Sequence, residues 1–135
     1  MGAFRVSPGR LEVHEVENLG DSPSEFLRVE LKQIPLGVPN LFHRGPAPEH
    51  AADRMAEEYV RPQLIIERII VVGSRAADLH HPERPSLLIA FSRATLRDTL
   101  LLPGEVRWLA AGETSTIAGL PESPAHVLRI ELRSD

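Results

Sequence analysis

The sequence predicts an all-β barrel or sandwich, and three observations support this fold class. Twelve Pro and nine Gly divide the 135 residues into short pieces. Most of these pieces are rich in Val, Ile, Leu and Thr, which is typical of strands bounded by turns. The segment SPSEFLRVELK (22–32) also returns as SPAHVLRIELR (123–133), with Ser, Pro, Leu, Arg, Glu and Leu in the same places. Self-similarity of this kind marks a duplicated supersecondary unit.

The strands can be placed in chain order from these apolar pieces and the turns between them. The N-terminal pieces are predicted as strands 3–7, 11–17 and 25–32. Those after residue 62 are predicted as strands 63–72, 86–91, 95–102, 105–109, 114–118 and 125–132. The repeat extends backwards, because GAFRVSP (2–8) matches GEVRWLA (104–110).

The strand predicted for residues 63–72 carries apolar residues on both faces, as expected for a strand buried between two layers. It is interrupted by Glu67 and Arg68. Because neighbouring residues of a strand point to opposite faces, we expect one charge on each face. One of the two then points into the barrel or into an interface.

Residues 33–62 break the strand pattern. After a Pro-rich loop, the segment PEHAADRMAEEYV (48–60) contains good helix formers, with Pro and Glu in its first turn. Ala52, Met55 and Tyr59 share one helical stripe, together with Ala51. The sequence therefore predicts one short helix, which connects the two β blocks.

Composition excludes several functional classes. There is no Cys, so disulfides, thiolate metal ligands and cysteine nucleophiles are ruled out, and the protein is expected in the cytoplasm. No run of about 18 apolar residues predicts a membrane span, and the N-terminus lacks the apolar core of a signal peptide. The net charge is −4, and the arginines are scattered singly, which argues against a nucleic-acid partner.

Residues 61–133 resemble the cupin superfamily. The segment IIERIIVVGSRAADLHHPERPSLLIAF is similar to the first cupin motif, and PGEVRWLAAGETSTIAGLPESPAHVLRIELR is similar to the second. The resemblance implies a double-stranded β-helix, a jelly-roll-like barrel, at residues 61–135. Residues 2–32 resemble a second-motif half, so residues 1–34 are expected to pack as extra strands on the barrel of the same chain or of a partner, with 35–60 as the connector.

In this family a metal is held inside the barrel by a His-x-His pair and a Glu from the first motif and by one His from the second. In this sequence Leu79 stands at the first His, His81 at the second and Ser86 near the Glu. Ser115 replaces the second-motif His, and Gly119 replaces the Asn that follows it. The resemblance therefore implies a degenerate site, and no metal or other cofactor is expected.

An alternative keeps a divalent transition metal in the barrel. It would be held by His81 with His80, if the loop slips by one residue, and by His14 from the N-terminal half. Adjacent His residues of a regular strand point to opposite faces, which argues against the pair. His43, His50 and His126 are single His residues without a ligand pattern.

Two functions follow from these observations. The first is a cupin that binds or senses a small molecule without catalysis, with His81, Arg68 and Trp108 as candidate ligand-binding residues. The second is a cupin enzyme, a metal-dependent oxygenase or an isomerase, that acts on a small polar metabolite, with His81 as acid or base and Arg68 as anion partner. A homodimer is expected, since residues 64–72 carry apolar residues on both faces, more than a lone barrel of this size needs to bury.

Overall fold

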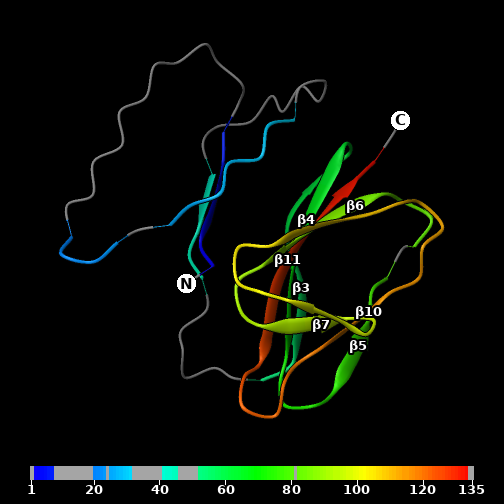
Figure 1. The fold of residues 1–135 in the computed structure, drawn as a ribbon. Coiled ribbons are helices and arrows are strands. Elements are labelled where there is room, and N and C mark those ends of the chain that lie inside the picture. Colours follow the sequence, from blue (N-terminus) through cyan, green and yellow to red (C-terminus); the bar gives the residue numbers. More distant parts are fainter. Residues whose placement is uncertain are drawn as a thin grey trace. The chain divides into compact units, whose positions relative to one another are not determined.

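The computed structural model describes residues 2–7, 20–23, 25–31, 41–45, 52–80 and 82–133. In these residues all regular structure is β-strand, and no helix could cross a membrane (Figure 1). The chain divides into two compact units, Met1–Phe4 with His43–Asp135, and Arg5–Phe42. The larger unit holds every residue of the candidate site.

The described residues of the N-terminal half contain less strand than the sequence predicts. β1 (Phe4–Val6) confirms the first predicted strand and pairs with β2 (Leu41–His43), which was not predicted. Residues 25–31 form no strand, so the prediction of a strand at 25–32 is wrong there, and Phe26 is 74% exposed. The predicted strand 11–17 lies outside the described residues.

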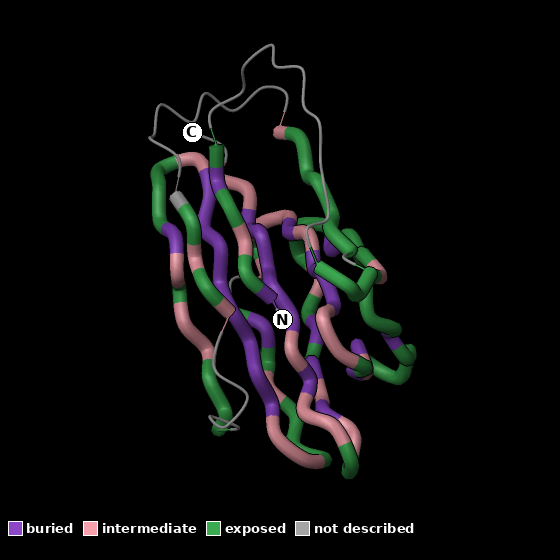
Figure 2. The backbone as a smooth tube through the Cα atoms, turned by 90° about the vertical axis from the view of Figure 1, so that its left-hand side faces the viewer, coloured by how far each residue is buried: buried purple, intermediate pink, exposed green. Residues whose placement is uncertain are grey.

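The larger unit consists of two sheets. The five-stranded sheet has the order β3-β4-β11-β6-β9 and the four-stranded sheet the order β5-β10-β7-β8. Strands of the first sheet are β3 (Arg54–Arg61), β4 (Leu64–Val71), β11 (Ala125–Leu132), β6 (Ser86–Ala90) and β9 (Val106–Leu109). Strands of the second are β5 (Ala76–Asp78), β10 (Thr116–Ala118), β7 (Ala94–Leu96) and β8 (Thr99–Leu101). Figure 2 shows the two layers, with buried residues along the long strands.

The hydrophobic core fills the space between these sheets, because its members come from both. β4, β6 and β11 contribute Ile69, Val71, Leu88, Ala90, Ala125 and Val127. The second sheet, β9 and the loop after β5 contribute Leu79, Ala94, Leu96, Leu101, Leu109 and Ile117. Alternation along each strand then defines the inner face of the five-stranded sheet.

The same alternation decides where the charges of β4 point. Glu67 is paired with Arg129 of β11, two residues from the core pair Ile69–Val127, so both charged side chains share the inner face. Arg68 is paired with Leu128 and lies on the outer face. The prediction of one charge on each face of this strand is confirmed.

The predicted helix is wrong, because residues 54–61 form β3 against the free edge of β4. A β-bulge between Glu57 and Tyr59 shifts the register, so that Met55 pairs with inner-face Ile69 and Tyr59 with Ile66 on the outer face. Met55 and Tyr59, which share one stripe in the predicted helix, therefore lie on opposite faces of a strand. Pairing with a buried neighbour outweighs the helix propensity of the segment.

The predictions for the C-terminal half are mostly confirmed. β4, β6, β9, β10 and β11 form where strands were predicted, and β11 matches its predicted range of 125–132. The predicted strand 95–102 is instead two strands, β7 and β8, separated by a turn at Arg97 and Asp98. β5 was not predicted.

Candidate functional site

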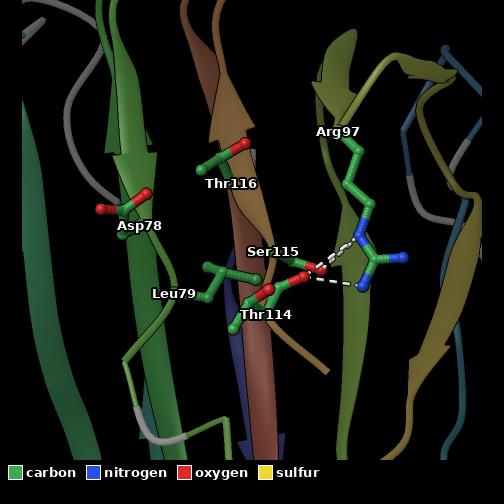
Figure 3. Close-up of a pocket in the computed structure, with 6 residues that line it drawn as sticks. All are labelled: Asp78, Leu79, Arg97, Thr114, Ser115 and Thr116. Carbon is green, nitrogen blue, oxygen red and sulfur yellow. Dashed lines mark hydrogen bonds between the residues drawn. The ribbon is translucent and has the colours of Figure 1, made fainter. Parts of the chain in front are cut away.

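Two positions at which the resemblance places metal ligands lie side by side. Leu79 follows β5 and Ser115 precedes β10, and the backbone N–H of Leu79 donates to the carbonyl oxygen of Ser115 at 2.9 Å. Both residues are buried, and both line an open hollow of about 530 Å³ (Figure 3). The remaining lining residues are Asp78, Arg97, Thr114 and Thr116.

The residues at these positions do not fit a metal. Leu79 belongs to the hydrophobic core, while Ser115 and Ser86 offer hydroxyl groups in place of imidazole and carboxylate donors. Among the described residues, no group of three His, Asp or Glu is placed to hold a metal ion. His81 and His14 lie outside the described residues and His80 is exposed, so a site built from these three remains a prediction.

Arg97 borders the hollow in an unusual backbone conformation. Its φ of 52° lies in the left-handed region, where every other described positive-φ residue is glycine. Its backbone N–H donates to Thr116 O at 3.0 Å. The guanidinium Nε donates to Thr114 O and to Ser115 Oγ at 3.1 Å each, and Nη2 donates to Thr114 O at 2.7 Å. These bonds hold a strained residue in place, as often occurs at binding sites.

A second hollow of about 320 Å³, also lined by Arg97, lies between the turn after β7 and strand β9. Its lining residues are Leu96, Arg97, Thr99, Arg107, Trp108, Leu109 and Glu113. Arg107 is paired with core residue Leu88, so its side chain starts from the inner face. Trp108 is paired with Leu87 and is 56% exposed on the opposite face of β9.

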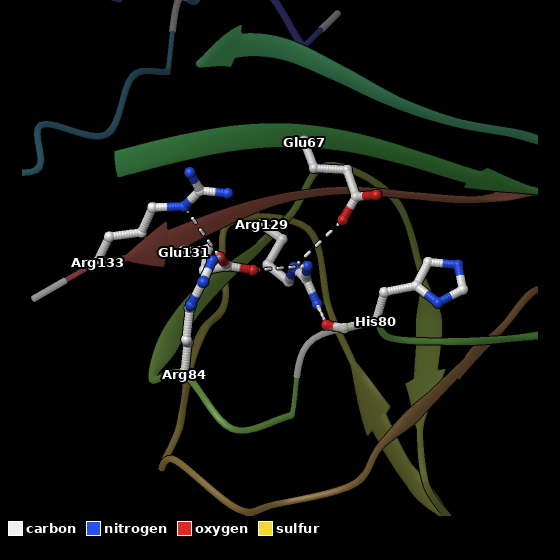
Figure 4. A network of polar contacts seen from close by, with 6 residues as sticks. All are labelled: Glu67, His80, Arg84, Arg129, Glu131 and Arg133. Atoms are coloured by element: carbon white, nitrogen blue, oxygen red, sulfur yellow. Dashed lines mark hydrogen bonds and ion pairs between the residues drawn. The ribbon is translucent and has the colours of Figure 1, made fainter. Parts of the chain in front are cut away.

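A buried ionic cluster occupies the inner face of the five-stranded sheet (Figure 4). Arg129 Nε lies 3.2 Å from Glu67 Oε2, and Arg129 Nη2 lies 3.1 Å from Glu131 Oε2. Arg84 Nη1 reaches Glu131 Oε1 at 2.8 Å, and Arg129 Nη1 donates to the carbonyl oxygen of His80. Arg129 therefore joins strands β4 and β11 to the loop that follows β5.

Glu67 is the weakly bonded member of this cluster. Its Oε2 is buried and makes no hydrogen bond of good geometry within the described structure. Burial raises the pKa of Glu67, and the positive charge of Arg129 opposes the shift. Glu67 is therefore a carboxyl group that takes up a proton more readily than an exposed one.

The outer face of the same sheet holds a second buried charge. Arg68 is 0% exposed; its Nε and Nη2 donate to the two carboxylate oxygens of Glu58 at 2.8 and 2.9 Å. Its Nη1 lies 2.8 Å from His126 Nε2, which must accept, because a guanidinium only donates. Burial, followed by the charge of Arg68, lowers the pKa of His126 to about 4. Phe4 also lies against Arg68, with its ring centroid 5.8 Å from the guanidinium carbon.

The three candidate ligand-binding residues are therefore not gathered in one place. His81 is outside the described residues, Arg68 lies on the outer face in contact with Glu58, and Trp108 lies at an edge strand. Their roles in ligand binding remain predictions. The residues that line the two hollows form a group centred on Arg97, which includes Trp108 but not Arg68.

Sequence reasoning did not single out Arg97 or Arg129. A signal for Arg129 was present, because Arg129 and Glu131 of β11 correspond to Arg28 and Glu30 of the first repeat copy. Arg28 Nε lies 3.2 Å from Glu30 Oε1, so the ion pair is repeated as well. For Arg97 no local signal exists, since a turn with positive φ usually carries Gly.

No protein-family model matches the chain, and no curated protein matches it. Solved structures do. A double-stranded beta-helix protein from Klebsiella pneumoniae aligns with a TM-score of 0.54 at 10% identity, covering 66% of this chain and 84% of that one. A Cupin 2 barrel protein from Salinispora arenicola gives 0.53 at 10% identity, over 68% and 89%. A cupin domain from Bordetella pertussis gives 0.52 at 8% identity, over 61% and 94%.

At these identities the likeness concerns the fold alone. The larger unit, with its two facing sheets and the strand order given above, is a double-stranded β-helix. This is the fold of the cupins, as the resemblance of residues 61–133 predicted.

Proposed function

We propose that the protein binds a small organic molecule at the hollow lined by Leu79, Ser115 and Arg97, without metal chemistry at that site. One observation carries the proposal. The positions that would hold imidazole ligands adjoin in space but bear Leu79 and Ser115, and they border an open hollow. A barrel that keeps the hollow and loses the ligands is suited to binding or sensing.

The lining of this hollow favours a small polar ligand. Arg97 offers donors, Asp78 offers a carboxylate, and Thr114 and Thr116 offer hydroxyl groups, all from exposed residues. Leu79 supplies an apolar contact. Such a mixture, with a few polar groups around an apolar patch, is typical of metabolite sites.

Binding can be tested by recording amide NMR spectra of the full chain with acetate, phosphate, glucose and glycine in turn. We expect at least one compound to shift the amides of Thr114, Ser115 and Thr116 in a saturable way. The variant Thr116→Trp, which fills the hollow, should remove the response, and Leu102→Trp, at an exposed position outside both hollows, should not. The absence of any saturable shift at these amides would contradict the proposal.

Metal content provides a second test. We expect less than about a tenth of an equivalent of Fe, Mn, Ni, Cu or Zn in untagged protein, because structural and catalytic sites need three or four protein ligands. Elemental analysis that finds close to one equivalent would instead favour the metal alternative with His81, His80 and His14.

A catalytic alternative rests on Glu67. A buried carboxyl group with a raised pKa inside the barrel is a candidate general acid or base for isomerisation of a small polar metabolite. The test is to incubate the protein in D₂O with each compound found to bind it, and to follow C–H exchange or conversion of the compound by NMR. Exchange that Glu67→Gln abolishes would favour the enzyme.

A further inference from the structure

We propose that the second hollow binds an oxyanion, a carboxylate or phosphate group, between the guanidinium groups of Arg97 and Arg107. This inference rests on the proposed function, because Arg97 lines both hollows. The charged group of the ligand is held in the second hollow, and the rest of the molecule extends into the first.

Arg107 supplies a cation that no described residue neutralises. No described residue makes a hydrogen bond or ion pair with its guanidinium, in contrast to Arg129, which pairs with Glu67 and Glu131. Arg129 and Arg107 flank Leu88 in one row across the inner face. The row therefore contains one arginine that is neutralised inside the barrel and one that is free at the hollow.

Arg97 supplies the second cation, and its position is fixed before any ligand arrives. Its Nε and Nη2 bond to Thr114 and Ser115, while no described residue bonds Nη1. Because these bonds already restrain the Arg97 side chain, ligand binding costs little additional side-chain entropy. A planar guanidinium with a free N–H edge suits a carboxylate or phosphate oxygen.

The hollow carries one opposing charge. Glu113 Oε1 lies 4.0 Å from Arg97 Nη2, and Glu113 Oε2 accepts a hydrogen bond from the backbone of Ala110 at 2.8 Å. Two guanidinium groups against one carboxylate leave the hollow positive, although the whole chain has a net charge of −4. Thr99 adds a hydroxyl group that can donate to the same anion.

The test is an amide NMR titration of the full chain with sodium phosphate and with sodium acetate, at constant ionic strength set with sodium chloride. We expect saturable shifts at Thr99, Arg107 and Glu113. A response to phosphate alone identifies a phosphorylated ligand, and a response to acetate alone identifies a carboxylate; either supports the proposal.

Variants distinguish specific binding at the second hollow from nonspecific electrostatic attraction of anions to the protein. Arg107→Gln should weaken binding about tenfold, because the anion loses one charge-assisted hydrogen bond. Arg93→Gln, which removes an exposed arginine outside both hollows, should leave binding within about twofold. Glu113→Gln should tighten binding, because it removes the opposing charge. Arg97→Gly, which accepts the positive φ, tests the second cation without backbone strain.

Equal affinity in Arg107→Gln and Arg93→Gln would overturn this inference, as would the absence of saturable shifts at the second hollow. If other compounds still shift Thr114, Ser115 and Thr116, the proposed function stands and only the anion site fails. If neither hollow responds to any compound, both proposals fail.

Discussion

At the scale of single residues, the most consequential side chain is Arg129. It lies inside the barrel, 4% exposed, between Glu67 and Glu131. Glu131 also pairs with Arg84, whereas Glu67 has no other arginine partner among the described residues. A buried ion pair contributes little net stability compared with apolar packing, but the loss of one partner is costly. Arg129 is therefore required mainly because Glu67 and Glu131 are present.

We expect Arg129→Met to lower the free energy of unfolding by about 3–5 kcal/mol, since Glu67 and Glu131 lose their shared partner. Urea unfolding of the variant measures this. Arg107→Met, which removes a free arginine from the same row, should change stability by no more than about 0.5 kcal/mol. The triple variant with Glu67→Gln and Glu131→Gln should regain much of the loss, and a triple variant as unstable as Arg129→Met would contradict the explanation.

His126 gives a prediction about pH. Its pKa is lowered from 6.5 to about 4 in the folded chain by burial and by Arg68, with Glu58 as the nearby opposing charge. Between these values the unfolded chain binds a proton that the folded chain does not, so stability falls as pH decreases from about 6.5 to about 4. Glu67, with its raised pKa, acts in the opposite direction.

The effect of His126 is isolated by comparing the wild type with His126→Gln, which can still accept a hydrogen bond from Arg68. Urea unfolding at pH 7 and at pH 4.5 should show a smaller loss of stability on acidification in the variant. Equal losses in the two proteins would mean that His126 does not take part in the acid response.

At the scale of strands, local sequence was sufficient where the chain resembles the cupin motifs. β11 forms at 125–132 as predicted, and Leu79 and Ser115 adjoin as the motif alignment implies. Local sequence was insufficient for β3, because the propensity of residues 48–60 contains no information about the edge of β4 that needs a partner. The role of Arg97 depends on a left-handed turn without Gly, which only the surrounding hydrogen bonds explain.

Gly119, which stands where the second motif has Asn, is required by packing. A Cβ at this position would lie 2.7 Å from Val71 O and still nearer to Gly73 O, and these backbone atoms cannot rotate away. Gly119→Ala should therefore destabilise the protein by about 3 kcal/mol. Gly112→Ala, at an open position with φ of 86°, should cost about 1–2 kcal/mol for backbone strain alone. Thermal unfolding of both variants checks the order; a milder effect at Gly119 would contradict it.

At the scale of the whole molecule, the role of the N-terminal segment is the main open prediction. Phe26, Leu27 and Val29 of this segment are exposed, so burial of these side chains is not what makes the segment necessary. Phe4 supplies a different reason. Phe4 lies against Arg68 and stacks on His43 with ring centroids 4.7 Å apart, so the segment helps to cover a fully buried charge.

Deleting residues 1–34 should make the remainder insoluble or molten, because Arg68 then loses the cover of Phe4. Solubility and the cooperativity of urea unfolding are the measurements. Phe4→Ala in the full chain should reduce stability without abolishing folding. If residues 35–135 stay soluble and unfold cooperatively, the N-terminal strands are dispensable.

The homodimer also remains a prediction, but β4 does not supply the apolar surface for it. All eight residues of β4 are buried within the single chain, so this strand leaves no apolar face for a partner. In the larger unit, exposed apolar side chains lie instead on three edge strands, at Val60 of β3, Leu100 of β8, and Val106 and Trp108 of β9. Light scattering should give twice the 14.9 kDa of one chain, and a mass near 14.9 kDa would contradict the dimer.

The position of β4 and β11 has a consequence for solvent exchange. Each is hydrogen-bonded to a strand on both sides, and β4 is buried along its whole length, so their amide protons should exchange with deuterium only when the whole unit unfolds. β8 and β9 are edges of their sheets in the described strand order, and their amides should exchange through local opening. The slowly exchanging strands β4 and β11 hold the Arg129 cluster, whereas the faster-exchanging strands β8 and β9 border the second hollow. Substitutions can therefore alter what the protein binds while its slowest-exchanging strands, and hence its fold, stay unchanged.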